Sequence, residues 1–183
     1  PRVCSYLDLP LQHTSDRILK LMNRGMAQAD IFRVIERARR RVPGVALRTS
    51  LIVGFPSETK EEFRAMCETA RALKFNRLGV FAYSREEKTR AYGFKGQVAA
   101  KVKQERMDIL MALQLEISRA LLKKEVGKTL EVIVDERRKG TRVYVGRTRQ
   151  DAPEVDGHVF LSARGPLSPG QIARCRVTKS FDH

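Results

Sequence analysis

The residues whose types and spacing most clearly suggest ligand binding lie in the segment RTSLIVGFPSET, which begins at Arg48. Arg48 and Ser50 alternate along a predicted strand and so share one face, and Gly54 follows the strand end. Ligands of open α/β sheets bind at the carboxyl ends of the strands, where Gln12 and Tyr83 are also expected. Gly54 has no Cβ, so its backbone can approach a ligand closely. This pattern favours a site for a ribose or an amino-acid carboxylate, although a glycine at a strand end is also typical of a simple turn.

Metal-binding residues do not group in the sequence. Cys4, Cys67 and Cys175 are far apart, and no pair has the spacing of metal ligands or of a disulfide framework. The three histidines are equally dispersed. We therefore predict no metal site within this chain, and the sequence assigns no catalytic residue.

Strands and helices alternate in the first two thirds of the chain. Strands are predicted over residues 3–9, 45–53 and 77–84, and the middle one is apolar on both faces, as a strand covered by helices on each side would be. Helices are predicted after an N-cap at Thr14 or Ser15, around residues 31–41, after a capping box formed by Thr59 and Glu62, and over residues 100–126. This order predicts an α/β fold with a parallel sheet.

The pattern changes at Gly127. Four short runs, TLEVIVDE, TRVYVGR, HVFLS and QIARCRV, are separated by Gly, Pro and Asp turns and predict a small all-β barrel. We therefore expect two domains, an α/β domain over residues 1–127 and a β-barrel over residues 128–183.

Composition restricts the class of protein. The chain has 183 residues, of which 42% are hydrophobic and 31% charged, as in ordinary soluble domains. No apolar run approaches the ~20 residues of a membrane span, so no membrane partner and a cytoplasmic location are expected. The formal net charge of +15 attracts polyanions and allows RNA contact through a basic surface.

Four segments resemble the methylthiotransferase branch of the radical S-adenosylmethionine (SAM) enzymes, and within it the RimO type. They are YLDLPLQHTSDRILKLMNR, LRTSLIVGFPSETKEEF, GVFAYS and GRTRQDAPEVDG. The resemblance implies the C-terminal part of a radical SAM domain, a partial TIM-like α/β barrel, followed by an OB-like TRAM barrel. It implies SAM as a cofactor, with Gln12, Arg48, Ser50 and Gly54 lining its pocket.

The RimO type modifies the β-carbon of an aspartate in ribosomal protein S-twelve of the small subunit. The resemblance therefore implies this protein as the partner, bound through Arg147, Asp151, Glu154 and Asp156. Carboxylates suit a basic partner, although Pro153 and Gly157 could equally shape a loop whose carboxylates are solvated.

The chain departs from the family at three points. The family has Gly where this sequence has Ser57 and Lys88, and a lysine is strained wherever the glycine adopts positive φ. The Cys-x3-Cys-x2-Cys motif that holds the family's four-iron four-sulfur cluster is absent. We therefore expect the cluster ligands to lie outside this chain and these residues to be inactive alone; Pro1, in place of Met, favours a portion of a longer protein. The alternatives are a tRNA methylthiotransferase, which the basic charge suits, and a non-catalytic binding module.

Overall fold

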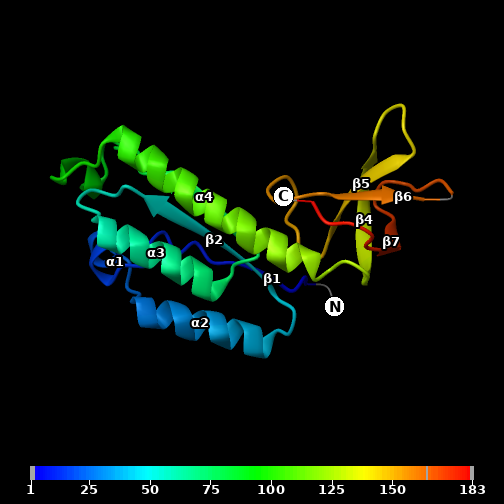
Figure 1. The fold of residues 1–183 in the computed structure, drawn as a ribbon, viewed down its shortest axis with the longest axis horizontal. Helices are drawn as coiled ribbons and strands as arrows, with labels where there is room; N and C mark the ends of the chain where they lie inside the picture. Colours follow the sequence, from blue (N-terminus) through cyan, green and yellow to red (C-terminus); the bar gives the residue numbers. More distant parts are fainter. Residues whose placement is uncertain (1–2, 164, 182–183) are drawn as a thin grey trace.

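The fold consists of two sheets joined by a long helix (Figure 1). The computed structural model describes residues 3–163 and 165–181, so Pro1 lies outside the described residues. The first part contains β1 (Tyr6–Asp8), α1 (Asp16–Leu21), α2 (Gln28–Arg41), β2 (Ala46–Val53), α3 (Lys60–Leu73), β3 (Arg77–Ala82), a 3-10 turn η1 (Arg90–Gly93) and α4 (Ala100–Lys123). The second contains β4 (Thr129–Arg137), β5 (Val143–Thr148), β6 (Val159–Ser162) and β7 (Ile172–Arg176).

The first sheet is parallel, with the order β1-β2-β3, as the alternation of strands and helices predicts. Helices connect the strands because a parallel pair needs a crossover rather than a hairpin. The prediction that both faces of β2 are covered is wrong for the described residues. Leu47, Leu51 and Val53 are buried, whereas Arg48, Ser50 and Ile52 on the opposite face are only partly buried.

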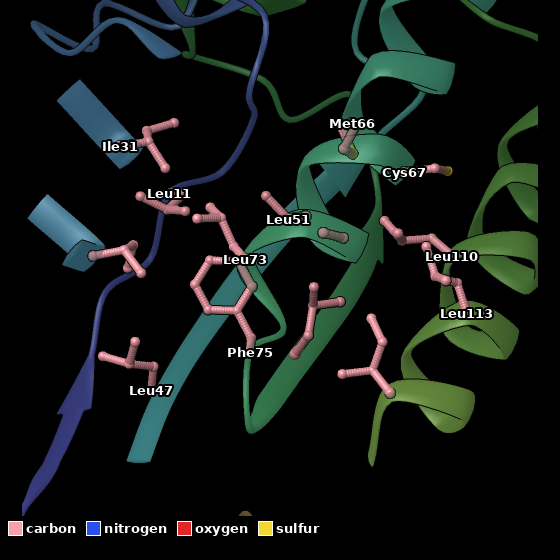
Figure 2. Close-up of a cluster of buried hydrophobic side chains, with 14 of the residues drawn as sticks. Leu11, Ile31, Leu47, Leu51, Met66, Cys67, Leu73, Phe75, Leu110 and Leu113 are labelled. Atoms are coloured by element: carbon pink, nitrogen blue, oxygen red, sulfur yellow. The ribbon is translucent and has the colours of Figure 1, made fainter. Parts of the chain in front are cut away.

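The covered face of β2 packs on a single hydrophobic core (Figure 2). Leu47 and Leu51 of β2 meet side chains from the helices and from Phe75, which precedes β3. Leu110 and Leu113 of α4 belong to the same core. The helices are therefore held by apolar burial against one face of the sheet, which leaves the other face to polar side chains.

Helix ends follow the predicted caps. Ser15 is the N-cap of α1, and Thr59 with Glu62 forms the capping box of α3. Thr59 Oγ1 accepts a hydrogen bond from Glu62 N at 3.2 Å, and Glu62 Oε2 accepts one from Thr59 N at 2.9 Å. The α4 helix ends at Lys123, three residues before the predicted end, and a turn leads to Gly127 with φ +89°. None of the described helices is long and apolar enough to cross a membrane.

The second sheet is antiparallel, in the order β6-β5-β4-β7, and curls into a half-barrel. All four runs predicted as strands form strands. Val132, Val134, Tyr144 and Leu161 make its small core. Gly146 allows β5 to approach β4, since a Cβ there would lie 2.3 Å from Ile133 O, near an irregularity of the β4 register. The barrel core is therefore much smaller than that of the first part.

Candidate functional site

Two of the predicted cofactor residues meet beside β2. Gln12, in the segment after β1, forms an isolated parallel bridge with the strand: its N–H donates to Ser50 O at 2.8 Å and its C=O accepts from Ile52 N at 2.7 Å. Gln12 has a φ of +68°, a conformation that is uncommon for a residue other than glycine. These bonds fix Gln12 next to Ser50 near the carboxyl end of the sheet, as the sequence predicts.

Gly54 forms the turn at the end of β2, with a φ of +72°. Its N–H donates to Glu58 Oε2 at 2.8 Å, and the N–H of Phe55 reaches the same oxygen at 3.3 Å. A Cβ on Gly54 would lie 2.4 Å from Lys103 Cγ on α4. The glycine is therefore required by its backbone conformation and by the packing of Lys103.

A buried cluster of charged and polar side chains supports this turn. Glu58 has a fully buried side chain and pairs with Arg106 of α4, whose Nη1 lies 2.5 Å from Oε1. His13, also fully buried, faces Glu58 Oε2 through Nε2 at 3.3 Å. Ser15 N donates to His13 Nδ1 at 2.9 Å, so Nε2 carries the hydrogen that points at Glu58. One carboxylate thus holds two backbone N–H groups, an imidazole and a guanidinium.

Sequence reasoning missed this cluster, although one signal for it exists. Arg106 occupies the apolar stripe of α4, at helical spacing from Leu110, Leu113 and Ile117. A lone arginine on a buried stripe indicates a buried ionic partner, because an unpaired buried charge is costly. The partners, Glu58 and His13, lie 48 and 93 positions away, and no local pattern identifies them.

Aromatic side chains line the same edge. The ring of Phe55 packs edge-on against Tyr83 at 5.2 Å and against Phe94 at 6.0 Å. Lys103 Nζ donates to Tyr83 O at 2.8 Å. The Tyr83 hydroxyl is buried and has no hydrogen-bond partner in the described part of the chain, and burial raises the pKa of this phenol. A buried, orphaned hydroxyl fits a site whose remaining partner is a ligand.

The loop after β3 is tied to the Gly54 turn. Ser57 N donates to Gly96 O at 2.7 Å, and Arg17 Nη1 donates to Ser57 Oγ at 3.0 Å. Both positions where the family has glycine adopt positive φ, +65° at Ser57 and +65° at Lys88. The strain expected of Lys88 is therefore present in its backbone, and Ser57 shares it.

Arg17 also pairs with Glu62, at 2.6 Å between Nη2 and Oε2. Burial disfavours the charged form of Glu62, but hydrogen bonds from Arg17, Thr59 N–H and Ser15 outweigh it and lower the pKa of this carboxyl from 4.5 to about 2. The start of α3 is therefore anchored to α1 by a strongly held carboxylate.

Arg48 lies apart from the other predicted cofactor residues. Gly54 lies six positions further along the chain, a distance of about 20 Å. Its Nη1 donates to Asp8 Oδ2 at 2.6 Å on the neighbouring strand. The structure thus brings together Gln12, Ser50 and the Gly54 turn, and places Arg48 at the amino half of the same face.

The four residues predicted to bind substrate differ in their surroundings. Arg147 pairs with Asp135 within the barrel sheet. Asp151 pairs with Arg77, and Asp156 accepts a hydrogen bond from Tyr6, so both carboxylates face the first part. Glu154 is exposed, with a φ of +62°. Only Glu154 therefore presents a carboxylate outward from this loop.

The described residues do not provide ligands for an iron–sulfur cluster. Cys4 is exposed, Cys67 is buried and Cys175 is partly buried, and all three are free. No group of three or more His, Cys, Asp or Glu side chains among the described residues could hold a metal ion. The described residues therefore do not supply the set of thiolates that a cluster of the family type needs.

Comparisons with known proteins agree with this architecture. A model of the radical SAM superfamily matches residues 2–70, and a TRAM domain model matches residues 126–183. The chain is similar in fold to coproporphyrinogen III oxidase (HemN) from Escherichia coli, a radical SAM enzyme, with a TM-score of 0.54 and 16% identity over 79% of this chain and 41% of that one.

Proteins found by sequence similarity have a higher identity to this chain. The chain is 44% identical, over 98% of its length, to the ribosomal protein uS12 methylthiotransferase RimO of Parabacteroides distasonis, of which it covers 42%. It is 46% identical, over 97% of its length, to RimO of Desulforudis audaxviator, of which it covers 39%. The chain thus spans about two fifths of the length of these relatives, over their C-terminal region. The chain therefore combines a radical SAM segment with a TRAM domain and is similar over nearly its whole length to RimO methylthiotransferases.

Proposed function

We propose that this chain is the C-terminal portion of a radical SAM enzyme that methylthiolates the β-carbon of an aspartate in ribosomal protein uS12. The observation that carries this proposal is the identity of about 44%, over nearly the whole chain, with curated uS12 methylthiotransferases. The match includes both the segment that supplies the Gly54 turn and the TRAM domain. This continuity supports a shared activity better than a match to either part alone would.

We propose that Gln12, Ser50 and the Gly54 turn contact SAM, with Arg48 further along the same face. The fixed backbone of the turn and the orphaned hydroxyl of Tyr83 support this assignment. When bound, SAM supplies the radical chemistry of the superfamily. The residues of this chain would bind and orient it, and the Phe55–Tyr83–Phe94 rings would exclude water from one side.

Amide chemical shifts of the full chain test the cofactor assignment directly. Titration with SAM should shift the amides of Gln12, Ser50 and Gly54 and leave those of the barrel strands unchanged. A Ser50→Ala variant should weaken the response, whereas Ser118→Ala, on α4, should not. Shifts confined to the barrel would contradict the assignment.

We propose further that the cluster ligands lie outside these 183 residues and that this chain alone does not catalyse the reaction. The dispersed cysteines support this view.

We also propose a domain boundary at Gly127, because β4 to β7 pair among themselves and not with the first sheet in the described structure. Under this proposal the barrel holds the macromolecular partner, and Glu154 is the carboxylate that faces it.

A second candidate, RNA contact by the barrel, has a specific observation in its favour. Phe160 and Phe181 are half exposed and pack edge-on at 6.2 Å. Arg138 lies over the ring of Phe160 at 5.8 Å, and Lys179 over that of Phe181 at 5.3 Å. Exposed rings beside basic side chains suit unstacked bases and phosphates. The two arginines nearest the DAPEVDG motif contribute less, because Arg147 and Arg149 already pair with carboxylates.

A side-by-side titration of the full chain with uS12 and with tRNA separates these candidates. The uS12 proposal predicts tighter binding of uS12 at physiological salt, and Glu154→Gln should reduce the association rate. Tighter binding of tRNA, with a steep loss of affinity as salt rises and a further loss in Phe160→Ala, would instead indicate a tRNA methylthiotransferase. Val155→Ala, in the same loop as Glu154, is the control for uS12 binding.

A further inference from the structure

The six residues 151–156, called here the DAPEVD segment, lie between the barrel and the amino half of the first sheet. Asp156 contacts all three strands of that sheet. Its Oδ2 accepts a hydrogen bond from the Tyr6 hydroxyl at 2.7 Å, and its Oδ1 lies 3.8 Å from Nε of Arg48 and 3.8 Å from Nε of Arg77. A single carboxylate of the second part therefore joins β1, β2 and β3.

Asp151 makes a second connection. One of its oxygens pairs with Arg77, and the other accepts hydrogen bonds from Thr148 N at 3.0 Å and Thr148 Oγ1 at 2.6 Å. The neighbouring Gln150 side chain donates to Gly44 O at 3.2 Å, in the turn that precedes β2. The end of β5 is thus held to the first sheet at several points.

Burial separates these carboxylates from the remaining one. The side chains of Asp156 and Asp151 are 3% and 7% exposed, whereas Glu154 is exposed. The segment also folds on itself, since Ala152 N donates to Asp156 Oδ2 at 2.8 Å. Carboxylates are buried in proteins when they are paired, and here the partners are arginines and a tyrosine of the same chain.

We infer that the DAPEVD segment is an interdomain clamp in which Asp151 and Asp156 fix the barrel against the amino half of the first sheet. Its partner is the surface formed by Tyr6, Arg48 and Arg77, and this interaction does not depend on the proposed enzymatic activity. The clamp uses two of the three carboxylates that a basic substrate could have contacted. It also gives Arg48 a role at the end of the sheet away from Gly54.

The clamp constrains how a partner can be held. Figure 1 shows β2 pointing away from the barrel strands, so the clamp and the Gly54 turn lie at opposite ends of β2. Arg48, which the clamp contacts, and Gly54 are six positions apart along the chain, a distance of about 20 Å. A macromolecule that contacts both the clamp and the Gly54 turn must extend over about this length.

Backbone ¹⁵N relaxation of the full chain tests the clamp, because it reports whether two parts tumble together. In the wild type, the amides of β2 and those of β4 should give one rotational correlation time. The double variant Asp151→Asn with Asp156→Asn should lose this common value, and the barrel amides should tumble faster than those of the sheet. Glu154→Gln removes a charge from the same segment without touching the clamp and should keep the common value.

A common correlation time in the double variant, or an equal loss in Glu154→Gln, would overturn the clamp. If the double variant does not fold, Tyr6→Phe combined with Arg77→Gln breaks the same contacts from the other side. In that variant too, separate tumbling of folded parts supports the clamp, and joint tumbling contradicts it.

Discussion

A buried carboxylate lies near each end of β2, and the two carboxylates have different structural roles. At the carboxyl end, Glu58 comes from the same part of the chain as the strand and accepts hydrogen bonds from two backbone N–H groups of the Gly54 turn. At the amino half, Asp156 comes from the barrel and contacts side chains of three strands. The first carboxylate shapes a turn, and the second joins two parts. Loss of Glu58 should therefore destabilise the first part of the chain, whereas loss of the Asp156 contacts should weaken the contact between the first part and the barrel.

The largest effect is expected for Glu58→Gln. This change leaves Arg106 buried without its anionic partner, and breaking a buried pair from one side costs about 3–5 kcal/mol. The free energy of unfolding, measured by urea denaturation, should fall by this amount. Glu68→Gln, an exposed change on α3, is the control and should have little effect. Equal stability of the two variants would show that the cluster does not support the turn.

A smaller effect at the same end concerns Glu62. The pKa of this carboxyl is lowered from 4.5 to about 2, so its ionised form stabilises the fold above pH 4.5. This stabilisation, up to about 3 kcal/mol, should be lost as pH falls from 4.5 towards 2. Unfolding free energies of wild type and Glu62→Gln should therefore differ at pH 6 and converge near pH 2. A difference that stays constant with pH would contradict the assignment.

The clamp should respond to Tyr6→Phe, which removes one hydrogen bond to Asp156 and costs about 1–2 kcal/mol. Burial, the hydrogen bond to Asp156 and the charge of that carboxylate all raise the pKa of Tyr6. A raised pKa means that the contribution of this phenol is complete below about pH 10 and is lost as pH rises further. The difference between wild type and Tyr6→Phe should thus shrink in alkaline solution. Tyr92→Phe, on the exposed loop, is the matched control.

The smallest effect is expected for Lys88→Gly. Lys88 has a φ of +65°, which glycine adopts without strain, so the substitution should raise the free energy of unfolding by under about 1 kcal/mol. Lys95→Gly, in the same loop, is the control; Lys95 is not among the described residues with positive φ, and its replacement should not stabilise. Destabilisation by Lys88→Gly would indicate that the lysine side chain makes a contact that matters more than the strain.

The fold could be predicted from the sequence because its determinants are local. The capping box of Thr59 and Glu62, the strand LRTSLIV and the four β runs depend on spacing within a few residues. Local spacing could not predict that helices cover only one face of β2. Ile52 is as apolar as a core residue, and its partial exposure depends on which elements lie on that face of the sheet.

The candidate site was predicted only in part, for a similar reason. Gln12 and Ser50 follow from the rule that ligands bind at strand ends, and the structure places them together. The Glu58 cluster joins residues from three distant segments, and a periodic pattern shows only that Arg106 is buried. The resemblance predicts that the carboxylates of the DAPEVD segment meet a basic partner, with a solvated loop as the alternative, yet Asp151 and Asp156 pair with arginines of the same chain.

Mass spectrometry of uS12 tests the proposed function most directly. The complete gene that encodes this chain would be expressed in a bacterial host lacking its own RimO enzyme, and uS12 would be isolated from the small ribosomal subunit. We predict that one aspartate-containing peptide of uS12 gains the mass of a methylthio group in place of a hydrogen, and that the host with an empty vector shows no gain. Unmodified uS12 in cells whose tRNA acquires new methylthio groups would contradict the proposal.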